Sequence, residues 1–157
     1  IHYDADKSRI LTPETAYAYV AEVFRAAVMA EHDAAVIRQL RAMDIDLEAA
    51  AQSVATMRAD RAPLNDEATA PLRLVPGVSL RTGEGFLGVF VGGRQVGQWE
   101  PDAARDHATS VLSAQTACDL DAAYRRFLIG PAGIEPDRAV AVVDGLAKFM
   151  QPEGDRP

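Results

Sequence analysis

The sequence predicts an α+β fold, a small antiparallel sheet combined with helices, and three observations predict it. Apolar residues recur at helical spacing over residues 12 to 57 and again over residues 101 to 150. Between residues 72 and 99 the pattern changes to alternation, and glycine becomes frequent. The run FLGVFV is followed by GG, a pair suited to a tight hairpin turn. We therefore expect a three-stranded antiparallel meander packed on C-terminal helices, preceded by an N-terminal helical region.

Three prolines in matching contexts mark helix starts: LTPETA at 11–16, WEPDAA at 99–104 and IEPDRA at 134–139. Proline fits the first helical position, where its missing N–H costs nothing, and the acid beside it faces the positive end of the helix dipole. We expect a helix to begin at each of these prolines.

The first helix, capped by Thr12, is expected to face the core through Tyr17, Val20, Ala21, Phe24 and Val28. Beyond it the large apolar residues change phase, which predicts a break near EHD at 31–33, with Asp33 capping a second helix. A third helix is expected from Asp46 to Met57, and the polar stretch up to Pro71 is the expected linker.

The predicted sheet has extended segments at 72–74 and 78–80 on either side of PG, a turn at TGEG, and strands at 86–91 and 94–99 joined by GG. Alternation places Phe86 and Phe90 on one face of the middle strand, and Leu87, Val89 and Val91 on the other. Neither face is polar, so both need cover, from helices of this chain or from a second copy. Phe86 and Phe90 are therefore candidate interface residues.

Three C-terminal helices are expected, at 101–118, at 121–129 ended by Gly130, and at 136–150. Their predicted inward positions are Ala104, Ala108, Val111, Leu112, Ala139, Val142, Val143, Leu146 and Phe149. Residues 1–60 then form an N-terminal helical region and residues 72–150 the sheet with its helices. We expect the two to share one core across a linker at about 61–71.

Composition narrows the possible functions. Of the 157 residues 48% are hydrophobic and 25% charged, which is typical of a globular chain, and no apolar run approaches the roughly 18 residues of a membrane span. The net charge of −7, with Lys and Arg scattered, argues against nucleic-acid binding. The lone Cys118 excludes an internal disulfide and favours a cytoplasmic location. The polar opening without Met predicts no signal peptide and residues missing upstream.

Trp99, His107 and Tyr124 are the candidate ligand-binding residues. Trp99 can instead staple the helix that follows it, and His107 can be a boundary residue without acid–base work, which would need a second group. EHD at 31–33 would bind a metal only with ligands from elsewhere, and Cys118 fits a small buried residue. TGEGFLG lacks the lysine of a phosphate loop. No metal and no cofactor is expected.

The residues assemble no nucleophile, base and oxyanion donors, which favours a non-enzymatic protein-interaction or regulatory module that binds itself or another protein. A small-molecule-binding protein or enzyme, with a pocket between sheet and helices, is the alternative. A DNA-associated regulator is the third hypothesis, because residues 34–58 and 122–146 each have a helix-turn-helix outline.

Overall fold

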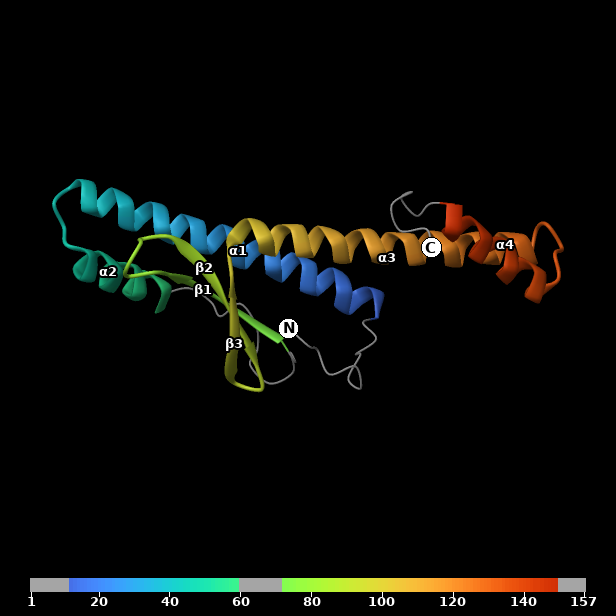
Figure 1. The fold of residues 1–157 in the computed structure, drawn as a ribbon, viewed down its shortest axis with the longest axis horizontal. Helices are drawn as coiled ribbons and strands as arrows, with labels where there is room; N and C mark the ends of the chain where they lie inside the picture. Colours follow the sequence, from blue (N-terminus) through green and yellow to red (C-terminus); the bar gives the residue numbers. More distant parts are fainter. Residues whose placement is uncertain (1–11, 60–71, 150–157) are drawn as a thin grey trace. The chain divides into compact units, whose positions relative to one another are not determined.

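The computed structural model describes residues 12–59 and 72–149, and every structural statement below concerns these residues. The elements in order are α1 (Pro13–Ala42), α2 (Leu47–Ala59), β1 (Leu72–Val78), β2 (Gly85–Val91), β3 (Arg94–Trp99), α3 (Pro101–Ile129) and α4 (Pro136–Phe149) (Figure 1). The α+β class with a three-stranded antiparallel sheet is confirmed. The chain forms two compact units, Ile1–Leu112 and Ser113–Pro157. The expected linker near 61–71 lies outside the described residues, and the division of the chain there stays a prediction.

α1 is one continuous helix of 30 residues, so the expected break near residues 31–33 is wrong. Its start is as predicted, because the Thr12 side chain accepts a hydrogen bond from the Thr15 N–H. Its buried face follows alternating steps of four and three residues without interruption: Ala16, Val20, Val23, Ala27, Ala30, Ala34 and Ile37. Most of these side chains are small. The prediction placed the large apolar residues on the inward face instead, and it therefore missed the continuity of the helix.

Several large side chains of α1 point away from the core. Tyr17 and Val28 are exposed, although their spacing predicts burial, and Phe24 is only half-buried. Asp33, expected as a helix cap, lies instead in the interior of the helix and is buried.

α2 begins as predicted, because the Asp46 carboxylate accepts hydrogen bonds from the N–H groups of Glu48 and Ala49, both at 3.0 Å. A short turn with Asp44 at φ 63° reverses the chain between α1 and α2. Val54 and Ala50 of α2 pack against Ile37 of α1 in a small buried cluster.

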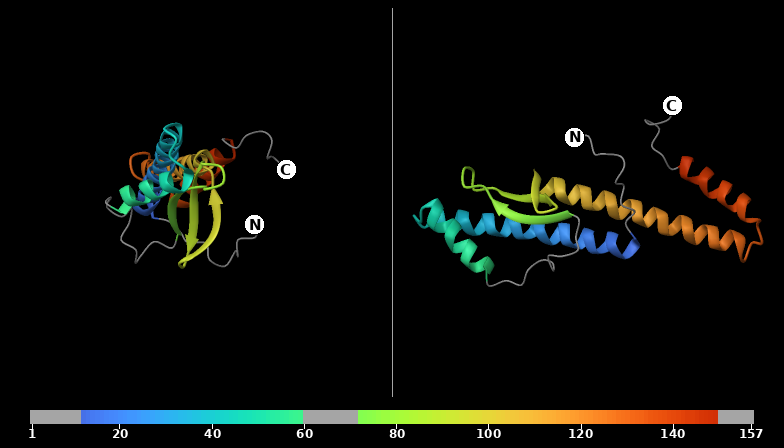
Figure 2. Two further views of the ribbon diagram at one scale, coloured as in Figure 1. Left: turned by 90° about the vertical axis from the view of Figure 1, so that its left-hand side faces the viewer. Right: turned by 90° about the horizontal axis from the view of Figure 1, so that it is seen from below.

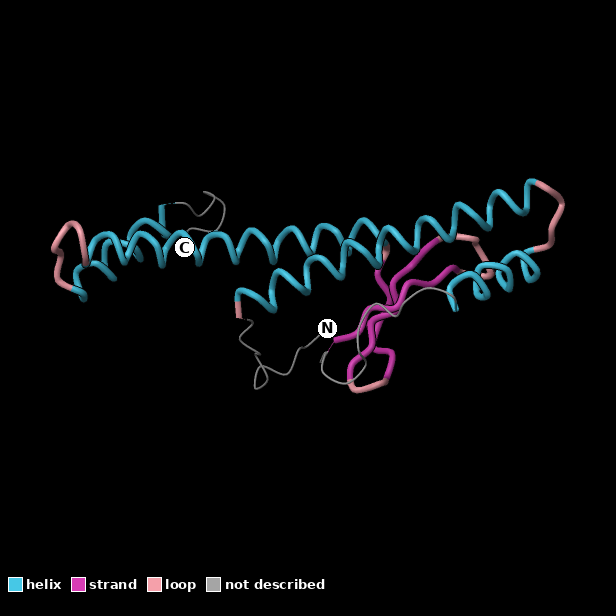
Figure 3. The backbone as a smooth tube through the Cα atoms, turned by 180° about the vertical axis from the view of Figure 1, so that it is seen from behind, coloured by secondary structure: helices cyan, strands magenta, loops and turns pink. Residues whose placement is uncertain are grey.

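The sheet has the order β1-β2-β3, with both pairs antiparallel (Figure 3). Gly92 and Gly93 join β2 to β3 with φ of 56° and 80°, the left-handed conformation that the predicted hairpin turn requires. The turn at TGEG is also confirmed, with a hydrogen bond of 2.8 Å from the Ser79 N–H to the Glu84 carbonyl. β1, in contrast, runs unbroken through Pro76 and Gly77, where two extended segments were expected. Proline is tolerated there because β1 is an edge strand.

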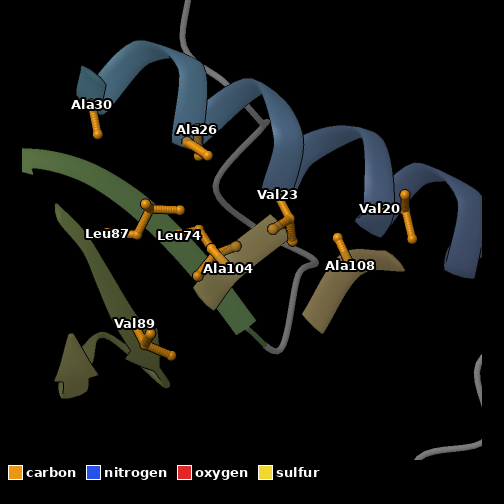
Figure 4. Packing of buried hydrophobic residues seen from close by; sticks show 10 residues of the cluster. Val20, Val23, Ala26, Ala30, Leu74, Leu87, Val89, Ala104 and Ala108 are labelled. Atoms are coloured by element: carbon orange, nitrogen blue, oxygen red, sulfur yellow. The ribbon is translucent and has the colours of Figure 1, made fainter. Parts of the chain in front are cut away.

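One face of the sheet packs on α1 and on the first turns of α3. Leu74, Leu87 and Val89 are buried from the sheet side, against Val23 and other residues of α1 (Figure 4). Ala104 and Ala108 of α3 complete this cluster, as their spacing predicts (Figure 4). β1 and β2 are the strands that lie next to α1 (Figure 2). The N-terminal helix and the start of α3 therefore share one sheet face.

Phe86 and Phe90, on the opposite face, are half-buried, and their rings lie over glycines of the sheet. The Phe86 ring occupies the space where a Cβ of Gly77 would stand, and Phe90 Cε2 lies 2.9 Å from the position of a Cβ on Gly88. Aromatic rings that cover strand glycines bury part of their own surface. This face is thus partly covered by its own side chains, and the interface role of Phe86 and Phe90 stays a prediction.

α3 is a single helix from Pro101 to Ile129, where two helices meeting near residue 120 were expected. Asp119 lies inside it and accepts a hydrogen bond of 3.0 Å from Gln115 Nε2, one turn earlier. The helix ends before Gly130, as predicted. Cys118 is exposed, contrary to the expectation that it is buried.

In the second unit, α4 packs against the last turns of α3. Leu128, Ala139 and Val143 form the buried cluster, and Ile134 of the connecting loop is partly buried against it. Val142 and Leu146 are exposed, although the sequence predicts them to point inward.

Candidate functional site

Two of the three predicted site residues, Trp99 and His107, lie together. Trp99 ends β3, and His107 lies in the second turn of α3, with the two ring centroids 5.0 Å apart. Tyr19 of α1 meets the His107 ring edge-on at 6.0 Å. Trp99 also packs against the core cluster that contains Ala104, as expected of a side chain that staples the start of a helix. The three rings tie β3, α1 and α3 together, and a ligand-binding role for Trp99 and His107 stays a prediction.

Tyr124, the third predicted residue, belongs to the second unit. Its side chain is 55% exposed on α3. The sequence predicts Tyr124 on a separate helix at 121–129, whereas it lies within the continuous α3.

An open groove of about 280 Å³ lies beside the start of α3. Its lining is mostly charged: Glu31, Ala34, Arg38, Glu84, Gly85, Glu100, Pro101 and Asp102. Arg105 Nη1 donates hydrogen bonds to Glu31 Oε1 at 2.7 Å and to Asp102 Oδ1 at 2.8 Å, and Arg105 Nη2 binds Glu31 Oε2. Both oxygens of Glu31 are thus engaged by one guanidinium group.

This bidentate pair shifts the pKa of both Glu31 and Arg105. The hydrogen bonds from Arg105 hold the pKa of Glu31 below its ordinary value. The same hydrogen bonds raise the pKa of Arg105. Both groups therefore stay charged in the folded chain at neutral pH, and they link α1 to α3.

A second ion pair is buried. Arg58 Nε of α2 lies 2.5 Å from Oδ2 of Asp33, whose side chain is 1% exposed, and Arg58 Nη1 donates a hydrogen bond of 2.8 Å to the Pro76 carbonyl. These contacts join α1, α2 and β1. Removing Arg58 would take a charge-assisted hydrogen bond from a carboxylate that is almost completely buried, which is costly for stability.

The EHD segment thus divides its side chains among different partners. Glu31 binds Arg105, Asp33 binds Arg58, and His32 Nδ1 lies 3.5 Å from Asp33 Oδ1. Over residues 12–59 and 72–149, no three His, Cys, Asp or Glu side chains come together in a metal-binding arrangement.

The second unit carries a run of exposed apolar side chains on α3. Leu120 is 61% exposed, Tyr124 55% and Phe127 57%. Steps of four and three residues place all three on one side of the helix. Helical spacing would have revealed this feature if one helix, and not two, had been predicted here. Ile129 of α3 and Val140, Val142 and Leu146 of α4 are also exposed. We call Leu120, Tyr124 and Phe127 the apolar stripe.

None of the helices in the described part of the chain combines the length and the apolar character needed to cross a membrane. Comparison with protein-family models, with curated proteins and with solved structures finds no match to this chain.

Proposed function

We propose that this chain is a non-enzymatic protein-interaction module that associates with itself through the apolar stripe of α3. The observation that carries the proposal is the exposure of Leu120, Tyr124 and Phe127, each more than half accessible. Contiguous apolar side chains on a surface are typical of protein interaction sites. Large aromatic side chains are enriched among the residues that dominate binding energy in such sites.

The small core of the second unit supports the proposal. Within residues 113–149, the buried cluster consists of Leu128, Ala139 and Val143. So few buried side chains supply little stabilisation for two helices, since a fully buried large apolar side chain contributes about 1.5–3 kcal/mol. Covering the stripe would add buried apolar surface to this unit.

The size of the stripe sets the expected affinity. An aromatic side chain buries roughly 150–250 Å² when fully covered, so three half-exposed side chains offer on the order of a few hundred Å² per copy. A standard interface buries about 800 Å² per partner. We therefore expect a reversible dimer with a Kd on the order of micromolar.

The groove beside Arg105 gives weaker support to the small-molecule alternative. Ligand pockets are mostly apolar with a few polar groups and typically hold about 300–1,000 Å³. This groove is smaller and mainly lined by charges, and Arg105 already engages Glu31 and Asp102. The geometry therefore favours the interaction module.

The test is the particle mass of the full chain as its concentration rises through the micromolar range, measured by light scattering or sedimentation. We expect a monomer that converts to a dimer. Leu120→Glu, which places a charge in the stripe, should shift the dimer Kd upward by at least about tenfold. Ala122→Glu adds the same charge at an exposed position on the opposite side of α3 and should leave the Kd within about twofold.

A chain that stays monomeric throughout this range would overturn the proposal. So would a dimer that tolerates Leu120→Glu as well as Ala122→Glu. Circular dichroism of both variants checks that α3 retains its helical content.

A further inference from the structure

We infer that the two copies meet along α3 in antiparallel orientation, with Tyr124 of one copy opposite Ser113 of the other and Leu120 opposite Ala117. This inference rests on the proposed function and names the partner surface as the same helix of a second copy. Five exposed α3 residues of the second unit carry it: Ser113, Ala117, Leu120, Tyr124 and Phe127.

The exposed side of α3 continues from Leu120 towards the beginning of the second unit at the same spacing. Ser113 and Ala117 precede Leu120 at steps of four and three residues, so they lie in line with the apolar stripe, and both are exposed. Alternating steps of four and three are the repeat of helices that pack along their length. The whole row from Ser113 to Phe127 therefore faces one partner helix.

Side-chain size changes along this row. Ser113 and Ala117 at one end are small, whereas Tyr124 and Phe127 at the other end are large. In a parallel pair, each side chain would meet its own copy, so the helices would lie close at Ser113 and be forced apart at Tyr124. In an antiparallel pair, large meets small at successive levels, and the two axes keep one separation.

Two-fold symmetry makes this match mutual. Pairing Tyr124 with Ser113 of the second copy necessarily pairs Ser113 with Tyr124, and the same holds for Leu120 with Ala117. The long cations that follow, Arg125 and Arg126, lie off the row and need not be buried. A row that is complementary to itself can pair with a second copy of the same chain and does not need a different protein as its partner.

Cysteine cross-linking in the full chain distinguishes the two orientations. With Cys118→Ser as background, Ser113→Cys and Tyr124→Cys are made separately, and disulfides are formed in each protein alone and in their mixture. Positions 113 and 124 are eleven residues apart, roughly 16 Å along a helix at 1.5 Å per residue. A disulfide needs Cα atoms within about 7 Å. We expect cross-linked dimers in the mixture and none with either variant alone.

A second pair keeps the stripe intact in case Tyr124→Cys weakens association. Thr116 and Ala123 flank the row on one edge and are exposed. In the antiparallel pair they approach each other across the interface, so Thr116→Cys mixed with Ala123→Cys should react with a short bismaleimide. Each variant alone should react at least about fivefold less.

The outcomes separate the two proposals. A monomeric particle mass for the Cys118→Ser protein would overturn the proposed function itself. A dimeric mass with cross-linking of the single variants and not of the mixtures would establish a parallel pair and overturn only the antiparallel arrangement. A dimer in which neither pair cross-links would place the interface elsewhere and overturn this inference as well.

Discussion

Glu31 shows how one carboxylate can respond to pH through its partner. Arg105 donates hydrogen bonds to both of its oxygens, and this lowers the pKa of Glu31 in the folded chain relative to the unfolded chain. The contribution of the Glu31–Arg105 pair to stability is therefore complete above the unfolded pKa of Glu31, about 4.3. It is lost as the pH falls through the pKa of Glu31 in the folded chain. Because the Glu31 side chain is almost half exposed, solvent screening keeps this contribution small.

Glu31→Gln is expected to lower the free energy of unfolding at pH 7 by up to about 1 kcal/mol. The difference from the parent chain should shrink towards zero as the pH falls through the lowered folded pKa of Glu31, because below that pH Glu31 is protonated in both the folded and the unfolded chain. Urea unfolding of the parent chain and of Glu31→Gln at several pH values measures this difference in the free energy of unfolding. Glu84→Gln removes an exposed carboxylate from the same groove and is the control. A gap that stays constant down to acidic pH would contradict the assigned role of Arg105.

At the scale of elements, β2 begins against the backbone of α1. A Cβ built on Gly85 would stand 2.6 Å from the Ala30 carbonyl oxygen and 2.8 Å from its carbonyl carbon. These are backbone atoms of a long helix, so they cannot move aside as a flexible side chain would. The absence of a side chain at Gly85 therefore allows the sheet to approach α1 closely.

Gly85→Ala should destabilise the fold by about 1–3 kcal/mol, the usual cost of forcing an extra carbon into a packed site. Gly97→Ala is the matched control in the same sheet, because a Cβ there meets nothing within 4 Å. Thermal unfolding of the two variants should therefore separate them clearly. Equal melting temperatures would show that the sheet lies farther from α1 than described.

Elements with a strong local signal could be predicted from the sequence. The Thr12 and Asp46 caps, the glycine turn at 92–93 and the helix starts at the prolines each depend on neighbouring residues alone. Elements whose continuity depends on distant packing could not. Pro76 stays in β1 because that strand lies at the sheet edge. The buried face of α1 continues past residue 33 mostly through alanines, so the pattern of large apolar residues does not reveal it.

The candidate site shows the same difference between contacts that local sequence predicts and contacts that depend on distant packing. Trp99 and His107 are close in sequence, and the structure brings them together. The pairs Glu31–Arg105 and Asp33–Arg58 are 74 and 25 residues apart, and no periodicity relates their members. Such contacts depend on how the helices and the sheet assemble, so the sequence pattern held no signal for them.

At the scale of the whole molecule, the net charge of −7 opposes binding to the phosphate backbone of DNA. The two helix pairs with a helix-turn-helix outline are α1–α2 and α3–α4, and each lies in a chain with more acids than bases. The full chain should therefore bind random duplex DNA no more tightly than about 10 µM at roughly 150 mM salt. Fluorescence anisotropy with a labelled duplex measures this. A sub-micromolar complex that weakens as salt is added would show the prediction to be wrong.

The alanines on the buried side of α1 have a consequence for mutational tolerance. In most cores, a polar replacement is the damaging one, because it loses hydrophobic burial. Ala26, Ala27 and Ala30 have no exposed surface, so a larger residue at these positions has little room in the packed core, however hydrophobic it is. Serine, only one oxygen larger, can bond to the carbonyl one turn back. In a saturation library of this helix, selection should therefore rank these positions by side-chain volume, with serine retained and leucine depleted.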